Sequence, residues 1–334
     1  LLERDIYTLL SYMTDTGKGL KRSLDGLMIC LGDGIHGDEW KWLRERFEVG
    51  FVEGVQKVLA PTLIWSDAAL YNTLPAYIRT RRWTLHKFYY EMAARGTLCG
   101  AVMRSENLTS AEGILFVPNF DLLSEAEKQA VAAYRNGAVV CTAAVENFTP
   151  ADYGISPDIY FVDKFSDYPM CAFALNASIE DKETITALAE MDDGTPNLED
   201  DPAEVAEHSN VLVETLTFCK VTTGFCEACA LLLKMVGNDL FTCNLPIVPM
   251  LMADGGYRLY ISNPEMNSYG YATVTARSPI KQVVNVSRYP VLPVKFMDSP
   301  DAGIGWMGKD SSGTQRTFRA KVTPGGVTIL DLFL

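Results

Sequence analysis

Apolar residues at helical spacing open the chain and predict a helix on Leu2, Ile6, Leu9, Leu10 and Met13. The polar residues 14–17 then interrupt this pattern and predict the end of the helix. Residues 24–31 are nearly all apolar, which is typical of a strand buried on both faces. A polar loop over residues 32–39 follows, and residues 40–59 are predicted to form a second helix. The first sixty residues therefore indicate a strand–loop–helix step preceded by a helix.

Beyond Pro61 the pattern alternates between short buried strands and helices. Strands are predicted at residues 62–66, 113–117 and 138–143, with a helix containing residues 81–95 after the first of them. Ser124 and Glu127 are typical of an N-cap and capping box, and Asn136-Gly137 predicts a left-handed C-terminus for the helix they begin. Strands separated by helices at this spacing predict an α/β fold with a parallel, flavodoxin-like sheet.

The remainder of the chain changes from irregular to β-rich. Residues 146–180 are irregular and strand-like, residues 191–207 form an acidic loop, and residues 211–236 predict a long helix. Short β runs follow at residues 257–262, 269–276, 283–286, 318–322 and 327–333. They predict a small all-β sandwich. The expected domains are a terminal βα unit at 1–60, a flavodoxin-like domain at 61–250 and the sandwich at 251–334.

Composition narrows the classes of partner. The 334 residues include 42 acidic and 29 basic side chains, a net charge of −13, and 48% are hydrophobic, which indicates a packed globular protein of two or three domains. So acidic a surface repels phosphate, and no Lys/Arg cluster interrupts it, so nucleic acid is not an expected partner. No apolar run approaches the roughly 18 residues that span a bilayer, so no membrane partner is expected.

The cysteines suggest a cellular compartment for the protein, and the first residue suggests that the chain belongs to a longer protein. Eight cysteines are scattered, several of them in apolar segments, which favours buried thiols in a reducing cytoplasm over a disulfide scaffold. The chain starts at Leu1 without a methionine and passes directly into helical periodicity. We therefore expect it to be the later part of a longer protein.

The densest group of functional side chains follows the apolar run at 24–31, and it comprises Asp33, His36, Asp38, Glu39 and Trp40. In a barrel of parallel strands the loops at the carboxyl ends of the strands form the active site. Carboxylates accept hydrogen bonds from sugar hydroxyls, and an indole stacks on the apolar face of a sugar ring. These five residues are the predicted substrate-binding residues. The alternative interpretation is a polar loop with a helix cap at Asp38.

Two cysteine patterns suggest chemistry that their surroundings do not favour. Cys226 and Cys229 form a CxxC motif near Cys219 and Cys243, but a helical pattern surrounds them, so buried thiols are favoured over a zinc or redox site. Cys141 ends a predicted strand where class I glutamine amidotransferases place their nucleophile, yet it lacks the flanking glycines and a paired histidine. We therefore predict no catalytic residue, no metal and no cofactor in this chain.

The alternating section resembles a known domain. The segments TLIWSD at 62–67, GILFVP at 113–118 and YRNGAVV at 134–140 resemble the amidotransferase-like trimerisation domain of trimeric β-galactosidases, which galactosyl-N-acetylhexosamine phosphorylases have in similar form. Those proteins run from a catalytic barrel through a flavodoxin-like domain to a small β-sandwich, and the order of elements in this chain is similar.

The resemblance implies a role for each part of the chain. Residues 1–60 would be the last part of a barrel, with the loop 33–40 at its sugar-binding rim, while the catalytic glutamates would come from earlier strands outside this chain. It implies a carbohydrate partner, a homotrimer and a non-catalytic C-terminal portion of a β-galactosidase-like glycoside hydrolase. The alternatives are part of a galactoside phosphorylase, a free-standing binding or assembly protein with a degenerate amidotransferase-like domain, and a thiol- or metal-dependent enzyme using Cys226 and Cys229.

Overall fold

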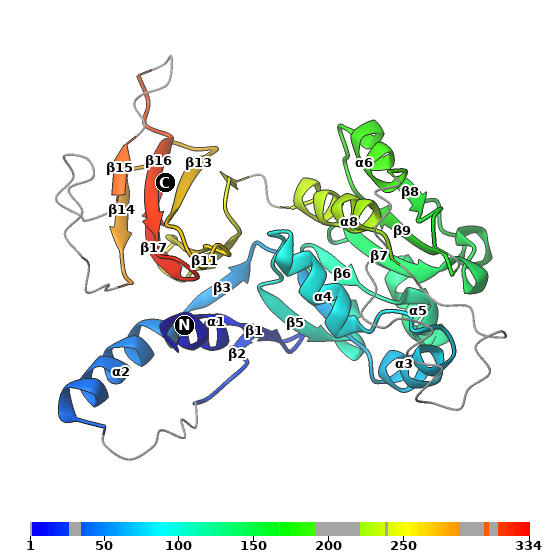
Figure 1. Ribbon diagram of the computed structural model, residues 1–334, viewed down its shortest axis with the longest axis horizontal. Coiled ribbons are helices and arrows are strands. Elements are labelled where there is room, and N and C mark those ends of the chain that lie inside the picture. The colour runs from blue at the N-terminus through cyan, green and yellow to red at the C-terminus, as the bar shows by residue number, and fades with distance from the viewer. Residues whose placement is uncertain are drawn as a thin grey trace. The chain divides into compact units, whose positions relative to one another are not determined.

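The chain folds into two compact units, each built from separate stretches of sequence. The computed structural model describes residues 2–26, 35–166, 168–191, 221–237, 240–287, 304–306 and 313–334. Unit 1 comprises residues 1–60, 98–102 and 238–334, and unit 2 comprises residues 61–97 and 103–237 (Figure 1). Strand β5 (Ala101–Arg104) crosses from the first unit into the second. The two units are defined by how closely their residues pack, and a compact unit is not the same as a domain. The predicted domain boundaries at residues 60 and 250 therefore stay predictions.

Five strands of an eight-stranded mixed sheet form the centre of unit 2. They lie in the order β4 (Thr62–Trp65), β6 (Leu115–Val117), β7 (Val139–Ala144), β9 (Met170–Leu175) and β8 (Ile159–Val162). The pairs β4–β6 and β6–β7 are parallel, which confirms the α/β alternation predicted from the sequence. The pairs β7–β9 and β8–β9 are antiparallel, so a fully parallel sheet was wrong for this edge. Two consecutive strands can be parallel only if a crossover of about a dozen residues or more joins them. The connection between β8 and β9 is too short for such a crossover.

The helices of unit 2 are α3 (Asp67–Thr80), α4 (Leu85–Ala94), α5 (Glu125–Ala133), α6 (Lys182–Ala189) and α8 (Thr223–Met235). The 3-10 helices are η1 (Ser105–Ser110), η2 (Phe120–Leu122), η3 (Val145–Asn147) and η4 (Pro150–Tyr153). The capping box of Ser124 and Glu127 at the start of α5 is confirmed. Residues 192–220, which include most of the predicted acidic loop and the start of the predicted long helix, lie outside the described residues.

Three predicted helices in unit 2 differ from the structure. The helix predicted at 211–236 is not continuous, because Thr222 is extended and α8 begins at Thr223. Helix α5 ends at Ala133 rather than at Asn136-Gly137, because Tyr134 is extended and its hydroxyl donates to the Gly113 carbonyl at 2.7 Å. The helix predicted to contain residues 81–95 is interrupted as well. Arg81 adopts a left-handed conformation with φ 52° and separates α3 from α4.

Unit 1 contains the predicted β-sandwich. One sheet has the order β10 (Phe241–Cys243), β13 (Gly270–Ala276), β16 (Thr317–Val322) and β15 (Ile304–Trp306). The other has the order β14 (Gln282–Asn285), β17 (Val327–Phe333), β12 (Tyr257–Ser262), β11 (Ile247–Met252) and β3 (Val55–Val58). Apolar side chains of both sheets, among them Leu259, Val274, Phe318 and Leu330, form one buried core.

The N-terminal residues are part of the same unit as the sandwich. They form α1 (Leu2–Ser11), the hairpin β1 (Met13–Asp15) and β2 (Leu20–Arg22), and α2 (Gly37–Gly50). The predicted helix at 40–59 was too long, since α2 ends at Gly50 and residues 55–58 form β3, which pairs with β11. The predicted strand at 24–31 lies outside the described residues from position 27 onward.

A second core in unit 1 joins these helices to the sandwich. Leu10 of α1, Leu43 of α2, and Met250 and Ile329 of the five-stranded sheet are all buried in one cluster. The five-stranded sheet is therefore covered by the other sheet on one face and by the N-terminal helices on the other. Within the ranges that the structure describes, no helix has both the length and the apolar character needed to cross a membrane.

Candidate functional site

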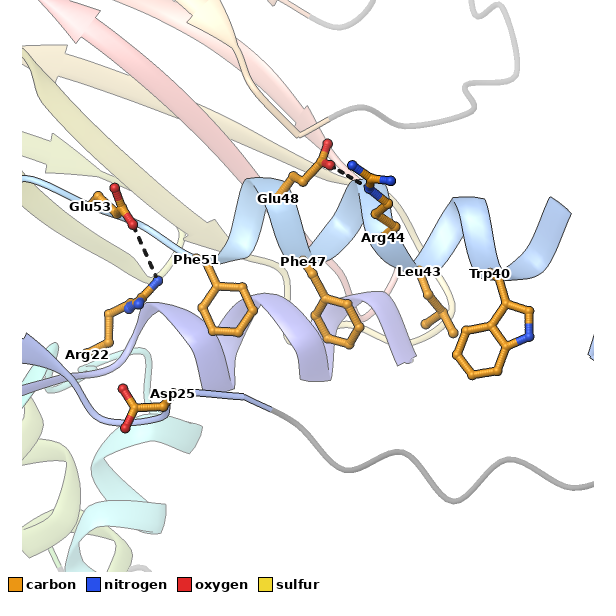
Figure 2. Close-up of a pocket in the computed structure, with 9 residues that line it drawn as sticks. All are labelled: Arg22, Asp25, Trp40, Leu43, Arg44, Phe47, Glu48, Phe51 and Glu53. Atoms are coloured by element: carbon orange, nitrogen blue, oxygen red, sulfur yellow. Dashed lines mark hydrogen bonds and ion pairs between the residues drawn. The ribbon is translucent and has the colours of Figure 1, made fainter. Parts of the chain in front are cut away.

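An open groove of about 760 Å³ runs along one face of α2 in unit 1 (Figure 2). The residues that line it are Arg22, Asp25, Trp40, Leu43, Arg44, Phe47, Glu48, Phe51 and Glu53. Six of these nine come from α2 and its C-terminal boundary, and they follow the helical pattern i, i+3, i+4, i+7, i+8 and i+11. Because 3.6 residues make one helical turn, that spacing places them along a single stripe.

Aromatic side chains form the apolar part of the groove. Trp40 lies at one end of the row and 53% of its surface is exposed, whereas Leu43 turns into the core. The rings of Phe47 and Phe51 lie 6.1 Å apart and continue the row along the helix. An exposed indole held on a helix that is anchored in the core offers a fixed flat face for stacking.

Charged side chains of both signs border these rings. Arg44 Nε and Glu48 Oε1 are 2.9 Å apart, and Arg22 Nη1 and Glu53 Oε1 are 3.9 Å apart. The Arg22 guanidinium also lies 4.9 Å from the centre of the Phe51 ring. The groove thus presents carboxylates that accept hydrogen bonds and guanidinium groups that donate them. Arg22 and Glu53 lie at the end of the groove opposite the exposed indole of Trp40 (Figure 2).

The structure separates the five residues predicted for substrate binding. Trp40 lines the groove, whereas His36 and Glu39 form the start of α2, where the Glu39 carboxylate accepts the His36 backbone N–H at 2.7 Å. Asp38 is exposed in the first turn, and the N-cap of α2 is His36 rather than Asp38. Asp33 lies outside the described residues. The role of the five in binding substrate stays a prediction.

Sequence reasoning missed the charged residues that line the same groove as Trp40, namely Arg22, Asp25, Arg44, Glu48 and Glu53. A local signal existed for part of this set, because Arg44 and Glu48 are four residues apart and Trp40 and Phe47 seven apart on a predicted helix. No local signal connects Arg22 and Asp25 to the helix, because the fold alone brings the end of the β1–β2 hairpin to its side.

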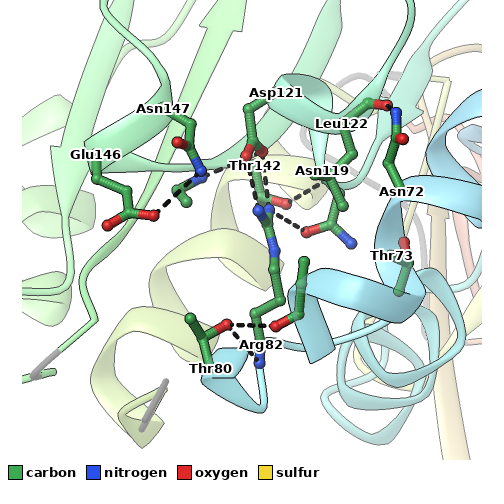
Figure 3. A network of polar contacts seen from close by, with 12 residues as sticks. Asn72, Thr73, Thr80, Arg82, Asn119, Asp121, Leu122, Thr142, Glu146 and Asn147 are labelled. Carbon is green, nitrogen blue, oxygen red and sulfur yellow. Dashed lines mark hydrogen bonds and ion pairs between the residues drawn. The ribbon is translucent and has the colours of Figure 1, made fainter. Parts of the chain in front are cut away.

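A second group of polar side chains lies at the carboxyl ends of β6 and β7 in unit 2 (Figure 3). Arg82 is completely buried, and its guanidinium donates to both carboxylate oxygens of Asp121, at 2.7 and 2.8 Å, and to Asn119 Oδ1 at 2.8 Å. Asp121 Oδ1 also accepts the Ala144 backbone N–H at 3.2 Å. A buried pair of this kind is stable only when further hydrogen bonds satisfy its atoms.

Asn119 follows β6 and links this ion pair to β7 and to the segment before α4. It has a left-handed backbone with φ 58°, its N–H donates to Thr142 Oγ1 at 3.1 Å, and its Nδ2 donates to the Trp83 carbonyl at 2.9 Å. The carboxyl ends of parallel strands are where α/β proteins bind ligands. Here these side chains are directed at one another, so the group acts as a structural clamp between strands and helices.

A tyrosine–carboxylate pair lies beside the clamp. The Tyr168 hydroxyl donates to Glu146 Oε1 at 2.8 Å, and Asn147 Nδ2 lies 3.3 Å from the same hydroxyl. Burial, together with the hydrogen bond to Glu146, raises the pKa of Tyr168 well above its usual value. Tyr168 therefore stays protonated and holds the exposed loop after β7 in place.

The structure confirms that the CxxC cysteines are buried thiols within a helix. Cys226 and Cys229 lie on α8 and are free, and burial raises the pKa of each far above its usual value. Cys243 lies in the other unit, and Cys219 lies outside the described residues. In the described part of the chain, no three His, Cys, Asp or Glu side chains come together as a metal site would require.

Cys141 occupies the interior of β7 rather than a turn. It pairs with Val117 of β6 on one side and Phe173 of β9 on the other, and the strand continues to Ala144. Burial raises its pKa well above the usual value, so it stays a thiol. A nucleophile needs a sharp exposed turn and a base beside it, and Cys141 has a buried position in a continuous strand instead.

Comparisons of the chain with models of known families, with curated proteins and with solved structures give no match.

Proposed function

We propose that unit 1 binds carbohydrate in the α2 groove and that the chain is the non-catalytic, substrate-contacting and assembly portion of a β-galactosidase-like carbohydrate-active enzyme. The observation that carries this proposal is the half-exposed indole of Trp40 in a groove bordered by Asp25, Glu48 and Glu53. Aromatic stacking supplies affinity for the apolar face of a sugar ring, and paired carboxylates and guanidinium groups hydrogen-bond its hydroxyls.

Unit 2 has the proposed role of assembly rather than catalysis, as a flavodoxin-like, amidotransferase-like domain in a homo-oligomer such as a trimer. The parallel strands β4, β6 and β7 with their connecting helices support this fold. The buried position of Cys141 within β7 supports the loss of any amidotransferase chemistry. The six free cysteines among the described residues support a reducing, cytoplasmic location.

Titration calorimetry of the 334-residue chain with galactose, lactose and longer β-galactosides tests the carbohydrate part of the proposal. We expect saturable binding that Trp40→Ala weakens by roughly tenfold, equivalent to about 1.4 kcal/mol. Tyr90→Ala is the matched control, because Tyr90 is 63% exposed on α4 in the other unit and its loss is expected to leave binding unchanged. Absence of saturable binding, or equal effects of the two variants, would contradict the proposal.

One observation favours a second candidate, a free-standing binding or assembly protein. The helices α1 and α2 share a buried core with the five-stranded sheet through Leu10, Leu43 and Met250, so they already have a partner within unit 1. The mass of the native protein distinguishes the two candidates. A product larger by a barrel of about 250 residues supports the enzyme portion, and a product of this length supports the free-standing protein.

A third possibility places the same portion in a galactoside phosphorylase. The geometry of the α2 groove suits a sugar in either enzyme, so the choice depends on the reaction of the whole protein. Release of galactose 1-phosphate from a β-galactoside in the presence of inorganic phosphate supports a phosphorylase, and release of free galactose supports a hydrolase.

A further inference from the structure

Helix α3 in unit 2 presents an apolar face to the surface. Its exposed apolar side chains, each between 36% and 81% exposed, are Leu70, Tyr71, Leu74, Tyr77 and Ile78. The buried side chains of the same helix are Ala69, Thr73, Ala76 and Thr80, which face the interior of the unit. The helix is thus apolar on its outer side, the reverse of the pattern of a solvated surface helix.

Opposite charges lie at the two ends of this exposed face. Asp67 begins α3 and Arg81 is its C-cap, and each is seven positions from Leu74. Residues seven apart on a helix lie two turns apart on nearly the same face. The Arg81 guanidinium lies 5.0 Å from the centre of the Tyr77 ring and donates to the Tyr77 and Ile78 carbonyls, which places it at the end of the apolar stripe.

The stripe is symmetric about Leu74. Counting outward from it, Tyr71 corresponds to Tyr77, Leu70 to Ile78 and Asp67 to Arg81. We propose that this face binds the same face of a second copy of the chain, with the two α3 helices antiparallel across a two-fold axis at Leu74. In that arrangement each aromatic or aliphatic side chain meets its counterpart, and Asp67 of each copy lies opposite Arg81 of the other.

Charge favours a second copy in this orientation. An antiparallel pair brings each terminal carboxylate to a guanidinium, whereas a parallel pair would bring like charges together. Each chain carries a net charge of −13, so two copies repel one another over most of their surface. On the α3 stripe the charges of Asp67 and Arg81 cancel, and Arg104, which pairs with Asp67, adds a guanidinium at that end. Association there therefore adds little repulsion between two acidic chains.

This inference rests on the assembly part of the proposed function and is independent of carbohydrate binding. A two-fold contact alone gives a dimer, and the same contact added to a three-fold one gives six copies. Either assembly contains an even number of chains. The prediction therefore concerns which surface makes the contact and what symmetry the contact has.

Sedimentation velocity of the 334-residue chain tests the position of the contact. We expect Leu74→Glu to halve the mass of the assembly, because it places two carboxylates face to face on the two-fold axis. Tyr90→Glu, an equally drastic change at an exposed site on α4, is the control and is expected to leave the mass unchanged. Circular dichroism of each variant verifies that the fold is retained.

Charge reversal tests the orientation. In Asp67→Arg alone or Arg81→Asp alone, both ends of a self-paired contact carry like charges, so each variant is expected to dissociate. A mixture of the two variants restores opposite charges at both ends and is expected to reassociate, which a mere folding defect would not produce.

The outcomes separate this inference from the proposed assembly role. An oligomer that is unaffected by Leu74→Glu overturns the α3 contact and leaves assembly through another surface. A chain that is monomeric at every concentration overturns both, whereas the calorimetric test of sugar binding is unaffected by either result. Variants that dissociate singly and stay apart when mixed overturn the antiparallel two-fold arrangement.

Discussion

The guanidinium of Arg82 and the carboxylate of Asp121 form a two-point ion pair at 2.7 and 2.8 Å with both side chains completely buried. Arg82 lies in the break between α3 and α4, and Asp121 follows β6. The pair therefore fastens the helical connection to the carboxyl edge of the sheet. Removing one partner leaves the other as a buried charge, which is far more costly than the loss of a surface pair.

Replacing Arg82 by Met is expected to lower the free energy of unfolding by about 3–5 kcal/mol, because Asp121 then remains buried without its counter-charge. Arg82→Met/Asp121→Asn is expected to cost less than the sum of the two single changes, since it leaves no unpaired charge. Urea denaturation of all three variants measures these differences. Arg44→Met removes the exposed pair with Glu48 and is expected to change stability by about 0.5 kcal/mol at most. Equal costs for Arg82→Met and Arg44→Met would contradict a structural role for the buried pair.

Glu91 on α4 gives a pH-dependent contribution to stability. Burial alone would raise its pKa, but the hydrogen bonds and charges of Lys87 and Arg95 outweigh burial and lower it. A carboxyl whose pKa is lower in the folded state stabilises the fold above its unfolded pKa of about 4.3 and loses that contribution as the pH falls through the folded value. Glu91→Gln is therefore expected to be less stable than the parent chain at pH 7, with the difference shrinking below about pH 4. Thermal unfolding between neutral and acidic pH measures this, and a difference that does not vary with pH would refute it.

Local patterns predicted the elements that local contacts determine. Ser124 and Glu127 form the expected capping box because both partners lie within one helical turn. Strands β12 and β17 occupy the predicted ranges because the turn residues that bound them are local signals as well. The alternation after Pro61 likewise gave the parallel strands, since each buried strand is nearly all apolar.

Contacts between residues distant in the sequence account for the rest. Residues 55–58 continue a helical pattern, yet they form β3 because β11, almost two hundred residues later, supplies a strand edge. Arg81 and Arg82 leave the helical conformation because Asp121 and Asn119, nearly forty residues away, bind the guanidinium of Arg82. Trp40 was found as a candidate for sugar binding, but Arg22 and Asp25 reach the groove only through the fold.

The thiols should differ in reactivity according to burial. Burial raises the pKa of Cys243 to about 11, and it raises the pKa of Cys141 and of Cys229 well above the usual value of a thiol. In a chain with Cys30 and Cys219 replaced by Ser, we expect one slow thiol reaction at pH 8 that accelerates as the pH approaches 11 and is abolished by Cys243→Ser. The other thiols are expected to react only on unfolding. Rapid modification of Cys226 or Cys229 in the native chain, followed by mass spectrometry, would instead restore a redox role for the CxxC motif.

Gly137 lies where two backbones meet. A Cβ added there would come within 1.9 Å of the Gly113 carbonyl oxygen, and that oxygen also accepts the Tyr134 hydroxyl. Gly137→Ala is expected to lower the free energy of unfolding by about 1–3 kcal/mol or more, because backbone rather than a flexible side chain must move. Gly26→Ala is the control, since no atom lies within 4 Å of its added Cβ. Chemical denaturation compares the two, and similar stabilities would show that the contact relaxes freely.

The pairing of β3 with β11 determines when unit 1 can be completed during synthesis on the ribosome. Residues 55–58 are made before unit 2, but β11 at 247–252, the strand beside which they lie, and the strands that continue the same sheet at 257–262 and 327–333 are made after it. Unit 2 lies almost entirely between them in the sequence, so most of its strands are made before β3 has its partner strand. The apolar side chains of α1 and β3 that pack in the second core of unit 1 therefore lack part of their partners until the last strands are made, and this segment is open to misfolding over that interval.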